Sequence, residues 1–211
     1  MRLRSDLRSD RVTPAVFDAL LEGIPPRDRD EWLDLVWDVE EVAADAPDLP
    51  KGCVPYLPCP VATVLDAIRE AGLTCDDVFV DVGSGAGRAA LLAHLKTGAG
   101  CIGLEIQSVL ARSAQARADR LGLSRLRFQE ADAADMVRSI TMGTVFFLYC
   151  PFGGHHLRRF LDGLEDVARA RPIRVCCIDM APLECQWLAP VLAASPHIHV
   201  YQSTLSHQTT V

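Results

Sequence analysis

The stretch VFVDVGSGAGR, residues 78–88, decides the fold of this chain. Its first five residues, Val78–Val82, are apolar apart from one acid, which is typical of a short buried strand. Three glycines follow at positions 83, 85 and 87, and glycine lets the backbone turn tightly and approach a ligand closely. A helix predicted from Arg88 would present free N–H groups to an anion. The stretch therefore predicts a strand, a ligand-binding turn and the start of a helix.

Strand and helix patterns alternate after this turn. Helices are predicted at 61–72, 88–96, 108–121 and 155–170, and further strands at 101–105, 126–129, 144–150, 173–178 and 197–203. This alternation predicts an α/β fold with a Rossmann-like, doubly wound and mostly parallel sheet that helices cover on both faces. Such sheets bind ligands beyond the carboxyl ends of their strands.

The region before this domain predicts two helices and a loop. Thr13-Pro14 is typical of a helix start. A second helix is predicted over 28–44, where apolar residues recur at helical spacing. Five prolines between residues 45 and 60 indicate a loop. We therefore expect an N-terminal helical extension at residues 1–50 and one domain at residues 51–211.

The net charge of −7 is concentrated in one segment. Residues 27–48 hold nine acids and two bases, so the remainder of the chain is neutral overall. This segment is either a solvated helix face or a rim that attracts a cationic substrate. Because no basic surface is indicated, we expect no nucleic-acid partner.

Membrane, metal and disulfide chemistry are also not indicated by the sequence. No apolar run is long enough for a membrane span and no secretory signal is apparent, so we expect a cytoplasmic protein. Eight cysteines without a CxxC pair favour buried thiols over a disulfide scaffold or a structural zinc site. The sequence does not indicate an oligomeric state.

The spacing of the glycines argues against a dinucleotide. That fingerprint needs glycine at position 88, where this chain has Arg88. Asp81 stands two residues before the first glycine and disfavours a phosphate. An acid beside the turn suits a ligand that carries an ammonium group as well as a carboxylate.

Two further acids follow the next two predicted strands. Glu105 stands 18 residues after Gly87, where a carboxylate can accept hydrogen bonds from ribose hydroxyls. Asp132 follows the strand at 126–129 and could accept from an exocyclic amine such as adenine N6. Each acid alone could be a helix cap or a surface charge. Together with Asp81 they indicate a ligand with amino-acid, ribose and adenine parts, which is S-adenosylmethionine.

These motifs resemble the cofactor motifs of class I S-adenosylmethionine-dependent methyltransferases. The resemblance rests on VFVDVGSGAGR (78–88), GLEI (103–106) and FQEAD (128–132), and it extends over about residues 52–203. It implies an antiparallel strand at the C-terminal end of the sheet. It also implies that the cofactor is held by Tyr56, Asp81, Gly83, Ser84, Gly85, Gly87, Glu105, Ile106 and Asp132.

Within this superfamily, VDVGSGAGR with GLEI is similar to the small protein-lysine methyltransferases and the non-SET histone lysine methyltransferases. Residues 56–61, YLPCPV, resemble the loop that folds over the cofactor in those enzymes. Cys59 stands where that family usually has Thr or Ser, a departure that concerns the hydrogen bonding of this loop.

The acceptor site is expected after the fourth strand of the domain. Pro151 and Phe152 match the second half of the Asn/Asp-Pro-Pro-Tyr/Phe motif of DNA and glutamine methyltransferases, but Tyr149 and Cys150 do not match the first half. DNA-base methylation is therefore disfavoured.

Several side chains of this segment are candidates for a role at the acceptor. Tyr149 could hydrogen-bond the acceptor, and Pro151 and Phe152 could line its site. His155 or His156 could remove a proton, or could simply cap a helix.

The expected activity is methyl transfer to an amine, with a protein lysine as the first choice of acceptor and a small-molecule O- or N-acceptor as the second. Two other classes are a non-catalytic S-adenosylmethionine-binding domain and a nucleotide-binding oxidoreductase, against which Arg88 argues. Replacing Glu105 by Ala or Gly85 by Val is expected to abolish cofactor binding.

Overall fold

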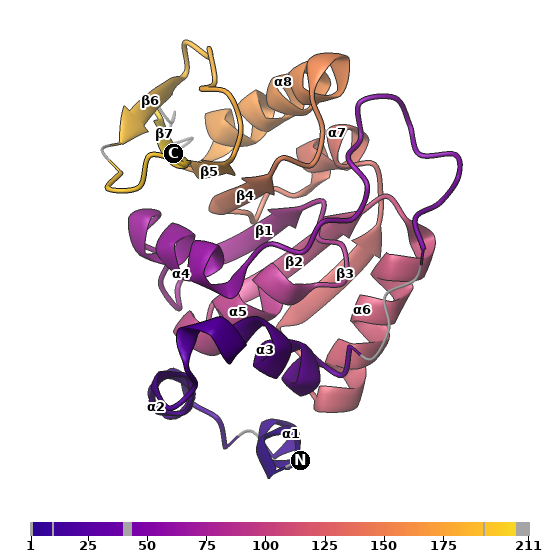
Figure 1. The fold of residues 1–211 in the computed structure, drawn as a ribbon. Helices are drawn as coiled ribbons and strands as arrows, with labels where there is room; N and C mark the ends of the chain where they lie inside the picture. Colours follow the sequence, from indigo (N-terminus) through magenta and orange to yellow (C-terminus); the bar gives the residue numbers. More distant parts are fainter. Residues whose placement is uncertain (1, 10, 40–43, 192, 206–211) are drawn as a thin grey trace.

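The computed structural model describes residues 2–9, 11–39, 44–191 and 193–205, and these contain one mixed sheet (Figure 1). The strands of this sheet are β1 (Val78–Val82), β2 (Gly100–Glu105), β3 (Leu126–Glu130), β4 (Val145–Tyr149), β5 (Arg174–Ile178), β6 (Leu188–Val191) and β7 (Ile198–Ser203). They lie in the order β3-β2-β1-β4-β5-β7-β6.

Helices precede the sheet and connect its strands. The α-helices are α1 (Arg2–Arg8), α2 (Pro14–Glu22), α3 (Arg29–Trp37), α4 (Val61–Glu70), α5 (Arg88–Thr97), α6 (Ser108–Leu121), α7 (Ala133–Met136) and α8 (Gly154–Ala170). Short 3₁₀ turns are η1 (Pro26–Asp28) and η2 (Val137–Ser139).

The strand order reverses between β1 and β4, which are neighbours in the sheet. From β1 the chain builds outward through β2 to β3, and it then crosses back to place β4 and β5 on the other side. All of these pairings are parallel. The predicted doubly wound, mostly parallel sheet is confirmed, and its switch point opens a crevice at the carboxyl ends of β1 and β4.

The C-terminal strands are antiparallel, as expected. β7 pairs antiparallel with β5, with Val175 opposite Tyr201, and β6 pairs antiparallel with β7. The sequence did not indicate β6, because Pro190 interrupts its apolar pattern and proline cannot donate to a ladder. An edge position tolerates that loss, and β6 is the outermost strand.

Helices cover both faces of the sheet (Figure 1). The core on one face joins buried residues of α4, α5 and α6 with those of α2 and α3, and the core on the other face joins α7, η2 and α8. Helix α5 lies between the sheet and the N-terminal helices, and this position explains why Leu91, Leu92 and Ala93 are all fully buried. The N-terminal helices therefore pack directly behind the glycine turn that begins α5.

The first predicted N-terminal helix begins as expected, whereas the second ends earlier than predicted. The Thr13 side chain accepts from Val16 N at the start of α2, which confirms the predicted cap. The prediction of one helix over 28–44 was wrong: α3 ends at Trp37, and Asp38 takes a left-handed conformation with φ of 65°. The last part of that prediction, at 40–43, lies outside the described residues.

Tertiary contacts hold Asp38 in this unusual conformation. Its carboxylate pairs with Arg4 of α1 at 2.6 Å and with Arg120 of α6 at 3.2 Å. Helix α1, which the sequence did not indicate, is joined to α3 in this way.

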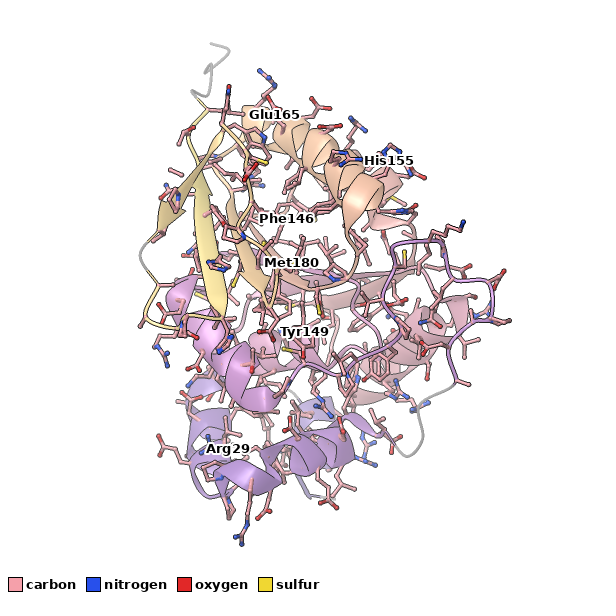
Figure 2. All side chains as sticks on the ribbon, turned by 45° about the horizontal axis from the view of Figure 1, so that its top comes forward. Arg29, Phe146, Tyr149, His155, Glu165 and Met180 are labelled. Carbon is pink, nitrogen blue, oxygen red and sulfur yellow. The ribbon has the colours of Figure 1, made fainter. Side chains whose placement is uncertain are left out.

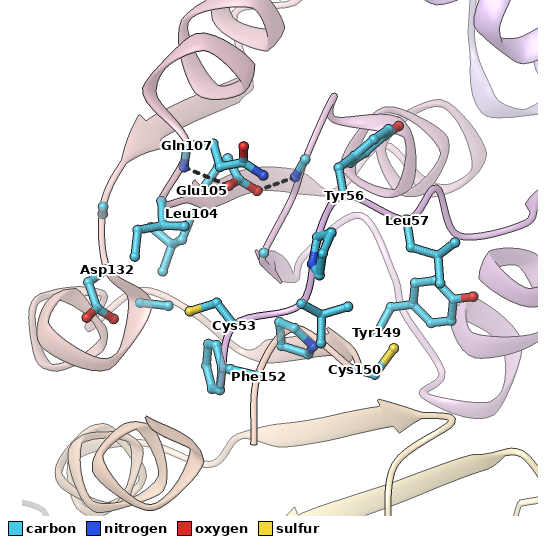
Figure 3. Close-up of a pocket in the computed structure, with 18 residues that line it drawn as sticks. Cys53, Tyr56, Leu57, Leu104, Glu105, Gln107, Asp132, Tyr149, Cys150 and Phe152 are labelled. Atoms are coloured by element: carbon cyan, nitrogen blue, oxygen red, sulfur yellow. Dashed lines mark hydrogen bonds between the residues drawn. The ribbon is translucent and has the colours of Figure 1, made fainter. Parts of the chain in front are cut away.

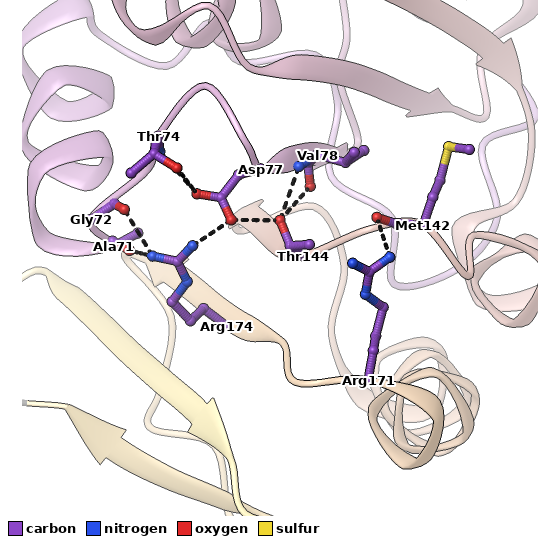
Figure 4. A network of polar contacts seen from close by, with 9 residues as sticks. All are labelled: Ala71, Gly72, Thr74, Asp77, Val78, Met142, Thr144, Arg171 and Arg174. Carbon is purple, nitrogen blue, oxygen red and sulfur yellow. Dashed lines mark hydrogen bonds and ion pairs between the residues drawn. The ribbon is translucent and has the colours of Figure 1, made fainter. Parts of the chain in front are cut away.

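The amino ends of β1, β4 and β5 are joined by a polar network (Figure 4). Asp77 accepts from Arg174 at 2.6 Å, from Thr144 Oγ1 at 2.8 Å and from the backbone N–H of Thr74 at 2.9 Å. Arg174 also donates to the carbonyl oxygens of Ala71 and Gly72. This network is structural, because it lies at the end of the sheet opposite the carboxyl ends of the strands.

Candidate functional site

A pocket lies at the carboxyl ends of β1–β4, beneath a loop that we call the strap, residues 45–60 (Figure 3). Its lining combines the strap, the glycine turn and the residues that follow β2, β3 and β4. The lining residues are Cys53, Val54, Pro55, Tyr56, Leu57, Gly83, Gly85, Leu104, Glu105, Ile106, Gln107, Ala131, Asp132, Ala133, Tyr149, Cys150, Pro151 and Phe152.

The glycine turn forms one wall of this pocket. Gly85 has a φ of 52°, and a Cβ atom there would overlap the ring of Tyr56, which lies against the turn. A Cβ at Gly83 would lie 2.7 Å from the Cβ of Pro151. The backbone N–H groups of Gly83 and Ser84 both donate to the carbonyl of Leu104, at 2.8 and 3.0 Å. The turn is thereby fixed to the end of β2, and it needs glycine both for its conformation and for these close approaches.

Glu105 connects the glycine turn to the turn that follows β2. Its Oε2 accepts from Gly85 N at 2.7 Å and its Oε1 accepts from Gln107 N at 2.8 Å. The residue is only 6% exposed, and burial raises the pKa of its carboxyl group against the lowering effect of these donors. The remaining acceptor capacity of this oriented carboxylate on the pocket wall fits the hydroxyl groups of a ribose.

A smaller hollow lies next to this pocket, beneath Tyr56, and Asp81, Ser84 and Tyr149 are among its lining residues. Asp81 is 3% exposed, and burial raises the pKa of its carboxyl group to about 7. Asp81 Oδ2 and Ser84 Oγ are buried and have no hydrogen-bond partner among the described residues. Buried polar atoms normally have partners. This pair therefore fits a ligand with polar hydrogens, such as the amino-acid end of S-adenosylmethionine.

Asp132 lies on the pocket wall at the far end from Tyr149 (Figure 3). Its Oδ1 accepts from Ala134 N at 2.9 Å and caps α7, while its Oδ2 lies 3.1 Å from Nε2 of His156. The His156 ring also packs on Phe152, with centroids 5.9 Å apart. Asp132 thus combines the capping role and the pocket position that the sequence left as alternatives.

The chain turns sharply after β4 and pairs with the strap. Cys150 has a φ of 35°, which is uncommon for a residue other than glycine. Cys53 and Phe152 form an antiparallel bridge, and Val54 N donates to the Pro151 carbonyl at 3.1 Å. Tyr149 borders both hollows, and burial raises the pKa of its phenol, so the ring stays neutral at physiological pH.

Comparisons with known proteins agree with this geometry. Residues 73–144 match the family model described as a methyltransferase domain. This segment contains the glycine turn, Glu105 and Asp132.

Residues 73–144 of this chain therefore form part of a methyltransferase domain.

Solved structures show the same fold. The methyltransferase is similar to a protein from Escherichia coli described as a methyltransferase, with 18% identity, 69% of this chain and 84% of that chain covered, and a TM-score of 0.54. It is also similar to precorrin-6y C5,15-methyltransferase from Geobacter metallireducens, with 14% identity and a TM-score of 0.50. That match covers 80% of this chain and 96% of the other chain. The comparison with an RNA methyltransferase from Salinibacter ruber in complex with S-adenosyl-L-homocysteine gives 24% identity and a TM-score of 0.48. It covers 70% of this chain and 92% of the other chain. None of the curated proteins matches the sequence.

The residues of this site fit S-adenosylmethionine as a cofactor, a compound that supplies a sulfonium methyl group for transfer. The protein contributes binding, orientation and electrostatics. Glu105 is oriented for the ribose, and the orphaned oxygens of Asp81 and Ser84 fit the amino-acid end. Tyr149 borders both hollows.

The structure brings most of the predicted site residues together. The main pocket contains Tyr56, Gly83, Gly85, Glu105, Ile106, Asp132, Tyr149, Pro151 and Phe152, and the smaller hollow contains Asp81 and Ser84. Gly87 borders neither hollow; a Cβ there would meet Phe128 and Trp37.

Neither candidate histidine lines these hollows. His155 is exposed at the start of α8, apart from Tyr149 (Figure 2), and His156 is engaged with Asp132. The structure therefore offers no imidazole next to Tyr149 among the lining residues.

Part of the acidic segment holds the methyltransferase together. Arg88, whose side chain is 10% exposed, binds Asp34 at 3.0 Å, Asp30 at 3.1 Å and the carbonyl of Cys59 at 3.3 Å. Asp30 also accepts from Val61 N at 2.7 Å and so caps α4. Asp30 and Asp34 therefore help to position the strap. Two further acids of the segment, Glu40 and Glu41, lie outside the described residues.

We expect Arg88→Met to lower stability by about 2–3 kcal/mol, because it leaves two partly buried carboxylates without their cation. Thermal or urea unfolding measures this loss. Arg127→Met, on the outer face of β3, is the matched control and should change stability by less than about 0.5 kcal/mol. Equal effects of the two substitutions would contradict the assigned role of Arg88.

The sequence did not indicate every residue of the site. Gln107 and Cys53 line the main pocket, and Trp37 donates through Nε1 to the Ala86 carbonyl at 2.6 Å behind the glycine turn. Of these residues, only Gln107 could have been found from the local sequence, because it follows Glu105 by two residues at the carboxyl end of β2. The other two reach the site through tertiary packing.

Proposed function

We propose that this methyltransferase transfers its methyl group to an amine, and that the side chain of a protein lysine is the acceptor. The observation that carries this proposal is the acid next to the predicted acceptor position. Asp179 directly follows Ile178 of β5, and Ile178 lies opposite Tyr149, the last residue of the neighbouring strand β4. Its side chain is 50% exposed, so a cation can reach it from solvent.

An amine acceptor must be able to enter the site from water, and it must then pack against an uncharged surface. Tyr149 is a neutral ring against which an alkyl ammonium can pack, and Asp179 attracts its charge. A lysine amine has a pKa of about 10.4 and must lose its proton before it can attack the methyl group. We propose that the proton leaves to water at this open position. The rate should therefore rise with pH between about 7 and 9.

The resemblance of the motifs at 78–88, 103–106 and 56–61 to those of protein-lysine methyltransferases supports lysine over other amines. The net charge of −7 also favours a basic polypeptide over a nucleic acid.

The deciding experiment incubates a cell extract with the enzyme and S-adenosylmethionine labelled in its methyl group. Protein, RNA and small-molecule fractions are then analysed separately by mass spectrometry. We expect label in methylated lysine of one or a few proteins. Label confined to RNA or to a small molecule would contradict the lysine proposal. No labelled product and no S-adenosylhomocysteine in any fraction would contradict amine transfer.

Asp179→Asn is expected to raise KM for a basic peptide about three- to fivefold, the effect of losing one half-exposed ion pair. The affinity for S-adenosylmethionine should not change, since Asp179 does not line either hollow. Asp166→Asn on α8, which removes an acid paired with Arg138, is the matched control. An unchanged KM for Asp179→Asn would count against a cationic acceptor at this position.

A further inference from the structure

Gln107 is buried and lines the pocket (Figure 3), and its side-chain hydrogen bonds join the sheet to the strap. Its backbone N–H donates to Glu105 Oε1 at 2.8 Å. Its side-chain oxygen accepts from Ala46 N at 2.8 Å, and its Nε2 donates to Asp45 Oδ1 at 2.8 Å. The residue after the ribose-binding turn is thus connected directly to the first residues of the strap.

Asp45 extends this series of bonds to the other side of the strap. The same Oδ1 atom accepts from Tyr56 N at 2.8 Å, and this bond and the one from Gln107 lower the pKa of Asp45. Tyr56 places its ring against Gly85 and lines both the main pocket and the smaller hollow. A continuous set of hydrogen bonds therefore runs from Glu105 to the backbone of the aromatic residue above the glycine turn.

We propose that Gln107 is a positioning residue that latches the strap over the cofactor pocket through Asp45 and so sets how long cofactor and product stay bound. Bound cofactor must leave past the strap, because residues 53–57 line the pocket together with the glycine turn. Opening the strap breaks the side-chain bonds of Gln107. This inference uses only the cofactor site and is independent of the proposed acceptor.

The latch also explains the use of a glutamine at this position. Gln107 faces a backbone N–H on one side and a carboxylate on the other, and its amide serves both because it carries an acceptor oxygen and a donor nitrogen on separate atoms. Gln107→Glu keeps the acceptor for Ala46 but places a second carboxylate against Asp45. It therefore breaks one arm of the latch and leaves the other arm in place.

The test measures the release of labelled S-adenosylhomocysteine after addition of excess unlabelled compound. Gln107→Glu should release it roughly tenfold faster than the wild type, the effect expected from losing one or two net hydrogen bonds. Adding Asp45→Asn should return release to within about threefold of the wild type. Because Asp45 Oδ1 accepts from both Gln107 and Tyr56 N, the asparagine of the double variant must turn so that its amide nitrogen faces the glutamate and its oxygen faces Tyr56 N.

Gln115 provides a matched control, because its side chain has the same bonding pattern outside the pocket. It accepts from Phe128 N at 2.8 Å and donates to Asp119 Oδ1 at 2.8 Å. Gln115→Glu should leave release within about twofold of the wild type. Asp45→Ala, at an exposed position, gives a second route to the open latch in case Gln107→Glu does not fold.

The latch is wrong if Gln107→Glu and Asp45→Ala release S-adenosylhomocysteine at the wild-type rate. It is also wrong if release is faster but the double variant does not reverse it. A lower melting temperature of Gln107→Glu with unchanged release would show a purely structural role and would overturn the proposal.

Discussion

Glu105→Ala should weaken the binding of S-adenosylmethionine by at least about a hundredfold, a loss of about 2.7 kcal/mol. The wild-type carboxylate is fixed by the N–H groups of Gly85 and Gln107, so it is oriented before the ligand arrives. Its removal takes away the ribose acceptor and leaves both buried N–H groups without a partner. Isothermal titration calorimetry with cofactor and with S-adenosylhomocysteine measures the effect.

The control for this prediction is one strand away. Glu130 lies opposite Glu105 in the register of β2 and β3, but it is exposed and does not line the pocket. Glu130→Ala should keep the wild-type affinity within about twofold. Equal affinities of Glu105→Ala and the wild type would remove the basis for the ribose site.

Asp81→Asn should stabilise the protein without ligand and weaken the binding of the cofactor. The buried carboxyl group has a pKa of about 7, well above its ordinary value of 3.8. Between these two values the folded state binds more protons than the unfolded state, so the contribution of this group to stability falls as the pH rises from about 4 to about 7. Asparagine does not ionise. The Tm of Asp81→Asn should therefore exceed that of the wild type by an amount that grows over the same pH range, to roughly 5 °C at pH 8.

Cofactor binding should respond in the opposite direction. A cationic ammonium group favours the ionised form of Asp81, so wild-type affinity should rise as the pH increases through about 7. In Asp81→Asn this rise should be lost, and affinity at pH 8 should be roughly ten- to a hundredfold lower than in the wild type. A pH-independent affinity of the wild type would contradict the assignment of Asp81 to the ammonium group.

Asp77, four residues earlier, serves as the control, because its pKa is shifted in the opposite direction from that of Asp81. Burial opposes its charge, but bonds from Arg174, Thr74 and Thr144 outweigh burial and lower its pKa. Its stabilising contribution is present above the ordinary pKa and is lost as the pH falls through the lowered value. Asp77→Asn should therefore destabilise the protein at neutral pH while cofactor affinity is retained, since the network lies at the opposite end of the sheet.

Local pattern predicted much of the sheet and of the cofactor side. The strands β1–β5 and β7 were indicated by apolar runs, and the glycine turn and Glu105 by their spacing along the chain. β6 was missed because Pro190 hides a short edge strand. The end of α3 was missed because it depends on contacts of Asp38 with α1 and α6, which are distant in sequence.

The sequence by itself determined the α/β class and the positions of three acids at successive strand ends, because both follow from short-range periodicity and strand order. Tertiary structure alone decided how those acids are used: Glu105 is oriented by Gly85, Asp132 is shared with His156, and Asp81 is left without a second partner. It also decided that Arg88 and Gln107 hold the strap. Hydrogen-bond partners of this kind come from segments far apart in the chain, and no local spacing encodes the distance between them.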